Sequence, residues 1–268
     1  MCFSHSFFIF AHPKNIHKII IRFMKRMKIA LVAMFAIFMG TTFTSCLDSD
    51  DSPNSYMEIV TIDDYTIEFT KKVKSDAGYT LEIQNPTSMQ LTDKSYPRRA
   101  LIGWQEIEGA DYTPGQSNYN AYFSGYYIIY SIGNTTMFDV TSVTPINRIE
   151  ANATGIGVSG NYLNLIFNIT YDDNTDPEDD FELYFKEVKN GMLYCKLVHT
   201  EAVETSKAKT GSHSMSFPLP SKGQLQSYSQ FADLEFTGDD KKTIKLVVTA
   251  DGPNDTEIES VQFTATLN

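Results

Sequence analysis

The chain has 268 residues, 42% of them hydrophobic, and it carries a formal net charge of −11 at pH 7. An acidic surface repels phosphate backbones, so the charge argues against nucleic acid as a partner. The apolar content is enough to bury a core, and 18 Phe and 15 Tyr residues favour pleated strands.

The N-terminal 45 residues are predicted to be a lipoprotein signal segment. They hold six Lys and Arg residues and no acid, so the rest of the chain carries 16 basic against 33 acidic residues. A basic stretch at 25–28 precedes an apolar stretch at 29–39, which is too short to span a membrane. Small residues then lead into Cys46, an arrangement that resembles a lipobox. The alternative is an ordinary secretory peptide followed by an incidental Cys.

Lipidation of Cys46 predicts attachment to a membrane, because several acyl chains together give a firm anchor. Counted from Met1 the segment is longer than usual, so 1–23 are interpreted as translation upstream of a misassigned start. Residues 46–56 then form an acidic tether. An acidic run after a lipidated Cys also resembles a surface-export signal, which predicts an outer-membrane lipoprotein exposed at the cell surface; the alternative is a plain spacer.

The remaining sequence predicts an all-β protein without an amphipathic helix. Residues 57–145 are expected to form a five-stranded, OB-like barrel, and residues 146–268 an antiparallel β-sandwich. Asn190-Gly191 between two alternating stretches predicts a hairpin. The expected strands cover 57–71, 79–84, 98–107, 119–131, 136–143, 161–171, 181–189, 192–199, 214–219, 231–237, 243–250 and 258–267.

Several motif matches predict no catalytic site. Gly155, Gly157 and Gly160 fit a dinucleotide fingerprint, but a strand follows where a helix is required. Cys195 alternates with leucines and is interpreted as a small buried hydrophobe. It lies four strand residues, about 13 Å, from His199, too far for proton transfer.

Two features suggest ligands. Asp172, Asn174 and Asp176 have the 1-3-5 spacing of a calcium loop without its Gly and its final Glu, so a weak Ca²⁺ site competes with a solvated acidic loop. No other cofactor is expected. Tyr122, Tyr126 and Tyr130 share one parity of a strand and are predicted to form an outward row that stacks on sugar rings. The alternative for this row is packing against the second domain.

Four segments (96–102, 160–167, 196–200 and 215–219) make the chain resemble the NigD-like lipoprotein family. The resemblance implies an N-terminal OB-type domain and a C-terminal β-sandwich, and the family name suggests a bacteriocin-immunity role. The family places an Arg before the His of its later strand, where this chain has Val198. We expect a non-enzymatic binding module for a carbohydrate or a protein. The alternatives are an envelope hydrolase that uses loop carboxylates and an immunity-type protein.

Overall fold

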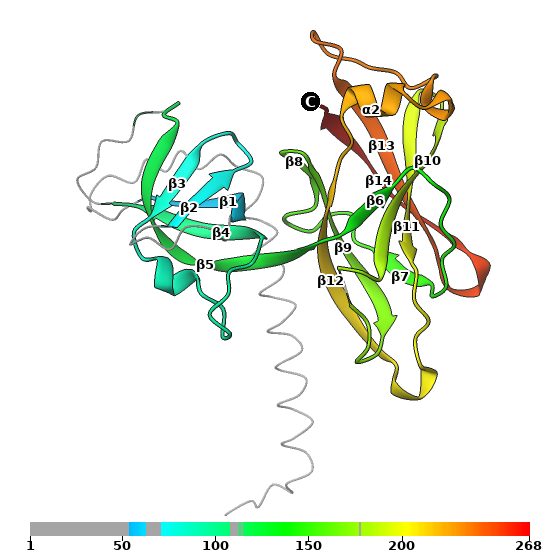
Figure 1. The fold of residues 1–268 in the computed structure, drawn as a ribbon, viewed down its shortest axis with the longest axis horizontal. Helices are drawn as coiled ribbons and strands as arrows, with labels where there is room; N and C mark the ends of the chain where they lie inside the picture. Colours follow the sequence, from blue (N-terminus) through cyan, green and yellow to red (C-terminus); the bar gives the residue numbers. More distant parts are fainter. Residues whose placement is uncertain (1–53, 63–70, 108–112, 114, 177) are drawn as a thin grey trace, which may run out of the picture. The chain divides into compact units, whose positions relative to one another are not determined.

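The computed structural model describes residues 54–62, 71–107, 113, 115–176 and 178–268, all within one compact unit that spans residues 51–268. This part of the chain is nearly all β, with a single short α-helix, α2 (Lys222–Gln226) (Figure 1). The strands are β1 (Ser55–Ile62), β2 (Lys71–Ser75), β3 (Thr80–Ile83), β4 (Arg99–Glu106), β5 (Asn118–Ile132), β6 (Asn134–Thr136), β7 (Ile146–Ile149), β8 (Gly157–Ser159), β9 (Tyr162–Tyr171), β10 (Phe181–Lys189), β11 (Met192–His199), β12 (Lys209–Pro218), β13 (Thr243–Asp251) and β14 (Glu257–Thr266). Within the same residues, no helix is long and apolar enough to cross a membrane.

The first five strands form a closed barrel. β1 pairs antiparallel with β2 and β4, β2 pairs with β3, and β4 pairs with β5. A parallel pairing of β3 with the first part of β5 closes the ring. Inward side chains such as Val60, Leu81, Ile102 and Phe123 fill it. The predicted OB-like barrel is therefore confirmed.

Some predicted strands are wrong in detail. The expected 57–71 strand is divided between β1 and β2, and residues 63–70 lie outside the described residues. Of the expected 136–143 strand only Thr136 is in a strand, β6, which pairs with β10 and not with the barrel. The expected 231–237 strand is a 3₁₀ turn at Ser229–Phe231, followed later by one isolated bridge.

The second half of the described chain is a sandwich of two sheets. β12, β9 and β7 continue the sheet that begins in the barrel, and β8 joins β9. The facing sheet has the order β14-β13-β11-β10-β6. Most pairings are antiparallel as predicted, and Asn190 and Gly191 form the predicted hairpin with φ of 52° and 73°. Two pairings in this sheet, β6–β10 and β11–β13, are parallel.

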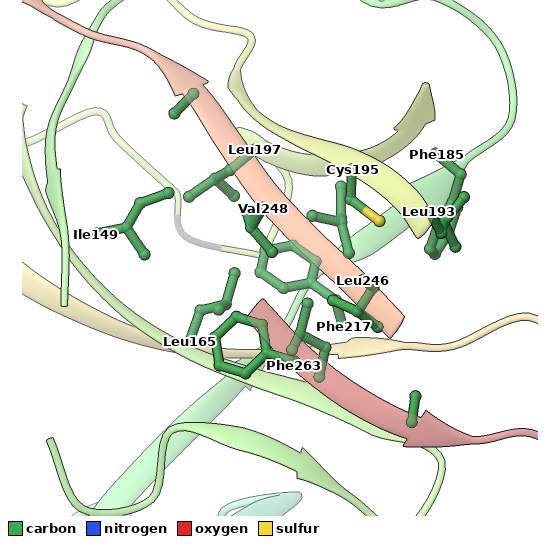
Figure 2. Packing of buried hydrophobic residues seen from close by; sticks show 14 of the residues in the cluster. Ile149, Leu165, Phe185, Leu193, Cys195, Leu197, Phe217, Leu246, Val248 and Phe263 are labelled. Atoms are coloured by element: carbon green, nitrogen blue, oxygen red, sulfur yellow. The ribbon is translucent and has the colours of Figure 1, made fainter. Parts of the chain in front are cut away.

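A single apolar core lies between the two sheets of the sandwich. Leu165 and Phe217 come from one sheet and Leu197, Val248 and Phe263 from the other (Figure 2). Cys195 belongs to this core and is fully buried, as its alternation predicted, and burial raises the pKa of its thiol. This thiol is packed as a hydrophobe and is not available as a nucleophile.

β5 is shared by both halves of the fold. Its last residues, Ser131 and Ile132, pair with β12. Gly133 follows, and a Cβ there would lie 2.3 Å from the Phe217 ring. The chain can therefore pass between the sheets at this point only because residue 133 has no side chain.

Candidate binding face

Two β-bulges decide which way the tyrosines of β5 point. Along the β4–β5 ladder, Gln105 pairs with Tyr122, Gly103 with Gly125 and Leu101 with Ile128, so Ser124 and Tyr127 are each an extra residue on β5. Each extra residue reverses the alternation of inward and outward side chains. The prediction of three tyrosines in one outward row is therefore wrong.

Tyr126 and Tyr130 have packing roles. Tyr126 faces into the barrel, where it contacts Phe123 and donates a 2.6 Å hydrogen bond to the Met89 carbonyl. Tyr130 lies on the outer side but is 2% exposed, and its hydroxyl donates to the Gly155 carbonyl. Burial raises the pKa of both phenols. Neither ring can stack on a ligand at the surface.

The bulges place a different residue, Tyr127, on the outer face. A Cβ at Gly103 would lie 2.9 Å from Tyr127 Cε2 and 2.5 Å from Ser124 Oγ, so both bulged side chains lie over this glycine. Met57 pairs with Gly103 from the other side. Tyr127 is 51% exposed, Tyr122 46% and Met57 42%. We call this surface the platform: the side chains of Met57, Tyr122, Ser124 and Tyr127 around Gly103 and Gly125.

The platform is uncharged. The outward residues of β1 and β4 are Ser55, Met57, Ile59, Thr61, Arg99, Leu101, Gly103 and Gln105. Arg99 is the charged member, and its side chain is fully buried and paired with Asp76. The outward residues of β5 carry no charge. The chain as a whole has a net charge of −11, so the absence of charge on the platform is specific to this surface.

The acidic loop does not gather its carboxylates around a common point. Asp172 accepts hydrogen bonds from the backbone N–H groups of Asn174 and Glu204, at 2.8 and 2.7 Å, which lower the pKa of its carboxyl group. Asp176 accepts from the Glu178 N–H. In the described chain no three His, Cys, Asp or Glu side chains are placed to hold a metal ion. The 1-3-5 spacing thus reflects carboxylates that fix the loop backbone.

His199 lies deep in the sandwich, away from Cys195. Its ring stacks on Phe181 at 4.3 Å, and neither ring nitrogen has a hydrogen-bond partner among the described residues. Burial is the main cause that lowers its pKa, and the nearby Asp180 opposes this effect. His213 also lies near Phe181, with ring centroids 6.1 Å apart, and its charge lowers the pKa of His199 further. Among the described residues, no Ser, Thr or Cys side chain forms a hydrogen bond with the ring nitrogens of His199.

A cleft of about 490 Å³ lies near α2, at one end of the sandwich. Met137, Leu219 and Tyr228 line it together with Thr, Pro, Gln and Ser residues. None of the lining residues is a carboxylate or a histidine. This cleft therefore does not hold the carboxylate pair that the hydrolase alternative requires.

A buried polar cluster around Arg99 was not predicted from the sequence. The guanidinium forms a double ion pair with Asp76, donates to Asn164, Ser216, Thr61 and the Ser159 carbonyl, and lies 4.2 Å from the centre of the Tyr162 ring. Two of the segments that carry the family resemblance, 96–102 and 160–167, meet here. Arg99 joins the barrel strand β4 to β8, β9 and β12.

Cys46 and its tether up to residue 53 lie outside the described residues.

No family model matches the sequence, and no curated protein matches it. Solved structures that resemble the chain include an uncharacterised protein from Parabacteroides merdae ATCC 43184 (TM-score 0.49, 12% identity, covering 80% of this chain and 99% of that one). A candidate lipoprotein from Bacteroides fragilis NCTC 9343 follows (TM-score 0.47, 17% identity, 80% and 99%). A NigD-like immunity protein from Bacteroides caccae ATCC 43185 is also among them (TM-score 0.40, 15% identity, 82% and 100%). The structural neighbours thus include a protein of the NigD-like kind that the sequence resembles.

Proposed function

We propose that this chain is a lipid-anchored envelope protein that acts by binding and not by catalysis, with the platform as its binding surface. The observation that carries the proposal is the exposure of Tyr122, Tyr127 and Met57 together on one uncharged sheet face. Large exposed apolar side chains on one face are typical of interaction sites.

The signal segment and Cys46 support the anchor, and the acidic tether supports export to the cell surface. Ser55, which begins β1, is nine residues after Cys46. A fully extended chain of that length spans about 30 Å, so the tether would hold the platform close to the outer leaflet. The protein would therefore meet ligands of the envelope itself.

The hydrolase alternative needs two carboxylates that converge on a cleft. The described acidic loop uses its carboxylates as backbone acceptors, and the cleft near α2 has none. An immunity-type protein would also act by binding, so the platform is the surface to test for either partner.

The test is retention in isolated envelopes. Cells produce the full chain, their envelopes are washed with a mild detergent that dissolves lipid, and the protein left on the high-mass material is measured. We expect the wild type to be retained and Met57→Asp/Tyr127→Asp to be released. Phe138→Asp is the matched control, because Phe138 is 72% exposed and lies outside the platform. Equal release of all three forms would contradict the proposal.

A further inference from the structure

We infer that the platform is a carbohydrate site that selects uncharged oligosaccharides, with the sugar rings stacked on Tyr122 and Tyr127. This inference rests on the proposed function and names the ligand class of the same surface. It follows from the spacing of the two rings, the open floor between them and the chemistry of the surrounding groups.

The two tyrosines are spaced for adjacent rings of one ligand. Tyr122 stands opposite Gln105, and the Tyr127 ring lies over Gly103, two residues earlier on β4. Residues two apart on one face of a strand are about 7 Å apart. Stacking on one ring therefore brings the next unit of a linear oligosaccharide to the other.

The floor between the rings is open. Apart from the adjacent residues Ser124 and Tyr126, no atom lies within 4 Å of the position that a Cβ would take at Gly125, and the backbone there needs no positive φ. A ligand ring can lie flat against the strand at this point, because no side chain occupies the space. Met57 lies on the β1 side of Gly103, beyond the Tyr127 ring.

Hydroxyl groups surround the floor. The hydroxyls of Tyr122, Tyr127 and Ser124 have no hydrogen-bond partner among the residues that the structure describes, so they are available to sugar hydroxyls. Tyrosine combines an apolar ring for stacking with a polar tip for such bonds. The platform has no charged side chain that could bind a carboxylate, sulfate or phosphate group. The negative net charge of the chain also repels polyanions.

The small area of the platform favours a sugar over a protein as the binding partner. Three strands are about 10 Å across, and the exposed pairs from Gln105 to Gly103 add about 7 Å along them. Stable protein interfaces cover about 800 Å² on each partner, roughly ten times this area. At its far end the platform is limited by the loop around Gly155, which covers Tyr130.

The experiment uses the full lipidated chain in detergent on an array of neutral and acidic glycans. Calorimetry with cellohexaose, maltohexaose and mannohexaose follows, with polygalacturonate as the anionic probe. We expect one or more neutral hexaoses to bind and polygalacturonate not to bind. Tyr127→Ala should weaken binding at least tenfold, whereas Tyr127→Phe, which keeps the ring, should retain most of it.

The Gly125→Leu variant tests ligand binding without disturbing the fold. The Leu side chain enters open space, so the melting temperature should not fall, but it fills the floor and should abolish binding. Phe138→Ala should bind like the wild type. Absence of neutral-glycan binding, equal binding of polygalacturonate or full binding by Gly125→Leu would each overturn the inference. If envelope retention still depends on Met57 and Tyr127 in that case, the proposed function stands and its ligand is not a neutral sugar.

Discussion

Arg99 shows how much of this fold depends on one buried cation. Its guanidinium has six hydrogen bonds, and Asn164, which accepts one of them, also accepts from Ser216 at 2.6 Å. Arg suits such a site better than Lys, because its planar fork binds a carboxylate through two parallel bonds.

Loss of Arg99 should therefore destabilise the protein strongly. Arg99→Met leaves the Asp76 carboxylate buried without its partner, and removal of one member of a buried pair costs about 3–5 kcal/mol. Urea denaturation measures this loss. In Arg99→Met/Asp76→Leu the loss should be smaller than the sum of the two single losses, because no charge stays unpaired. Additive losses would show that the two side chains are not coupled.

His199 should make the stability depend on pH between 7 and 5. Burial lowers its pKa below the ordinary value of 6.5, so the unfolded chain takes up a proton before the folded chain does. Stability is thus full above pH 6.5 and falls as the pH drops below it. His213 has a lowered pKa from burial and adds to this loss, whereas Asp180 and Asp172 near His199 reduce it.

Unfolding free energies of the wild type and His199→Leu, measured at steps from pH 7 to 5, test this prediction. The variant should show a shallower slope, because one of the two titrating imidazoles is gone. The carboxyl group of Asp172, whose pKa is lowered, titrates below this window and does not affect the comparison. Identical slopes would contradict a neutral, buried His199.

At the scale of elements, regular alternation predicted the structure well and irregular strands did not. β9 and the β10–β11 hairpin follow the alternation and the Asn-Gly signal closely. β5 does not, since its two bulges reverse the alternation within four residues, so the candidate site moved from Tyr126 and Tyr130 to Tyr127. Gly103 and Gly125 were the available signal, because glycine inside a strand often marks a bulge or a close approach.

In the short helix α2, too, a local sequence signal was present where a regular pattern was not. Five residues are too few for an apolar periodicity, yet Ser221 and Gln224 form a capping box that the sequence displays. The start of this helix could be predicted from its capping residues, although its apolar periodicity was too short to detect. The Arg99 cluster could not be predicted in the same way, because its members come from residues 61 to 216 and meet only after the sheets have assembled.

At the scale of the whole molecule, the predicted anchor at Cys46 would determine where the proposed binding face can work. A chain without the acyl groups would leave the envelope, and the platform would lose its high local concentration near envelope ligands. The prediction of lipidation rests on the thiol of Cys46, because the diacylglycerol is attached through sulfur.

Cys46→Ser should therefore give an unprocessed or soluble protein, since the hydroxyl of serine does not replace the thiol in this transfer. Fractionation of cells into membrane and soluble parts, followed by mass measurement of the N-terminal peptide, compares it with the wild type. The wild type should partition with membranes and carry acyl chains on Cys46. Cys195→Ser is the matched control; its thiol is buried in the sandwich core, so it should partition like the wild type if it folds. Equal partitioning of wild type and Cys46→Ser would remove the anchor, and the platform would then have to act without a fixed distance from the membrane.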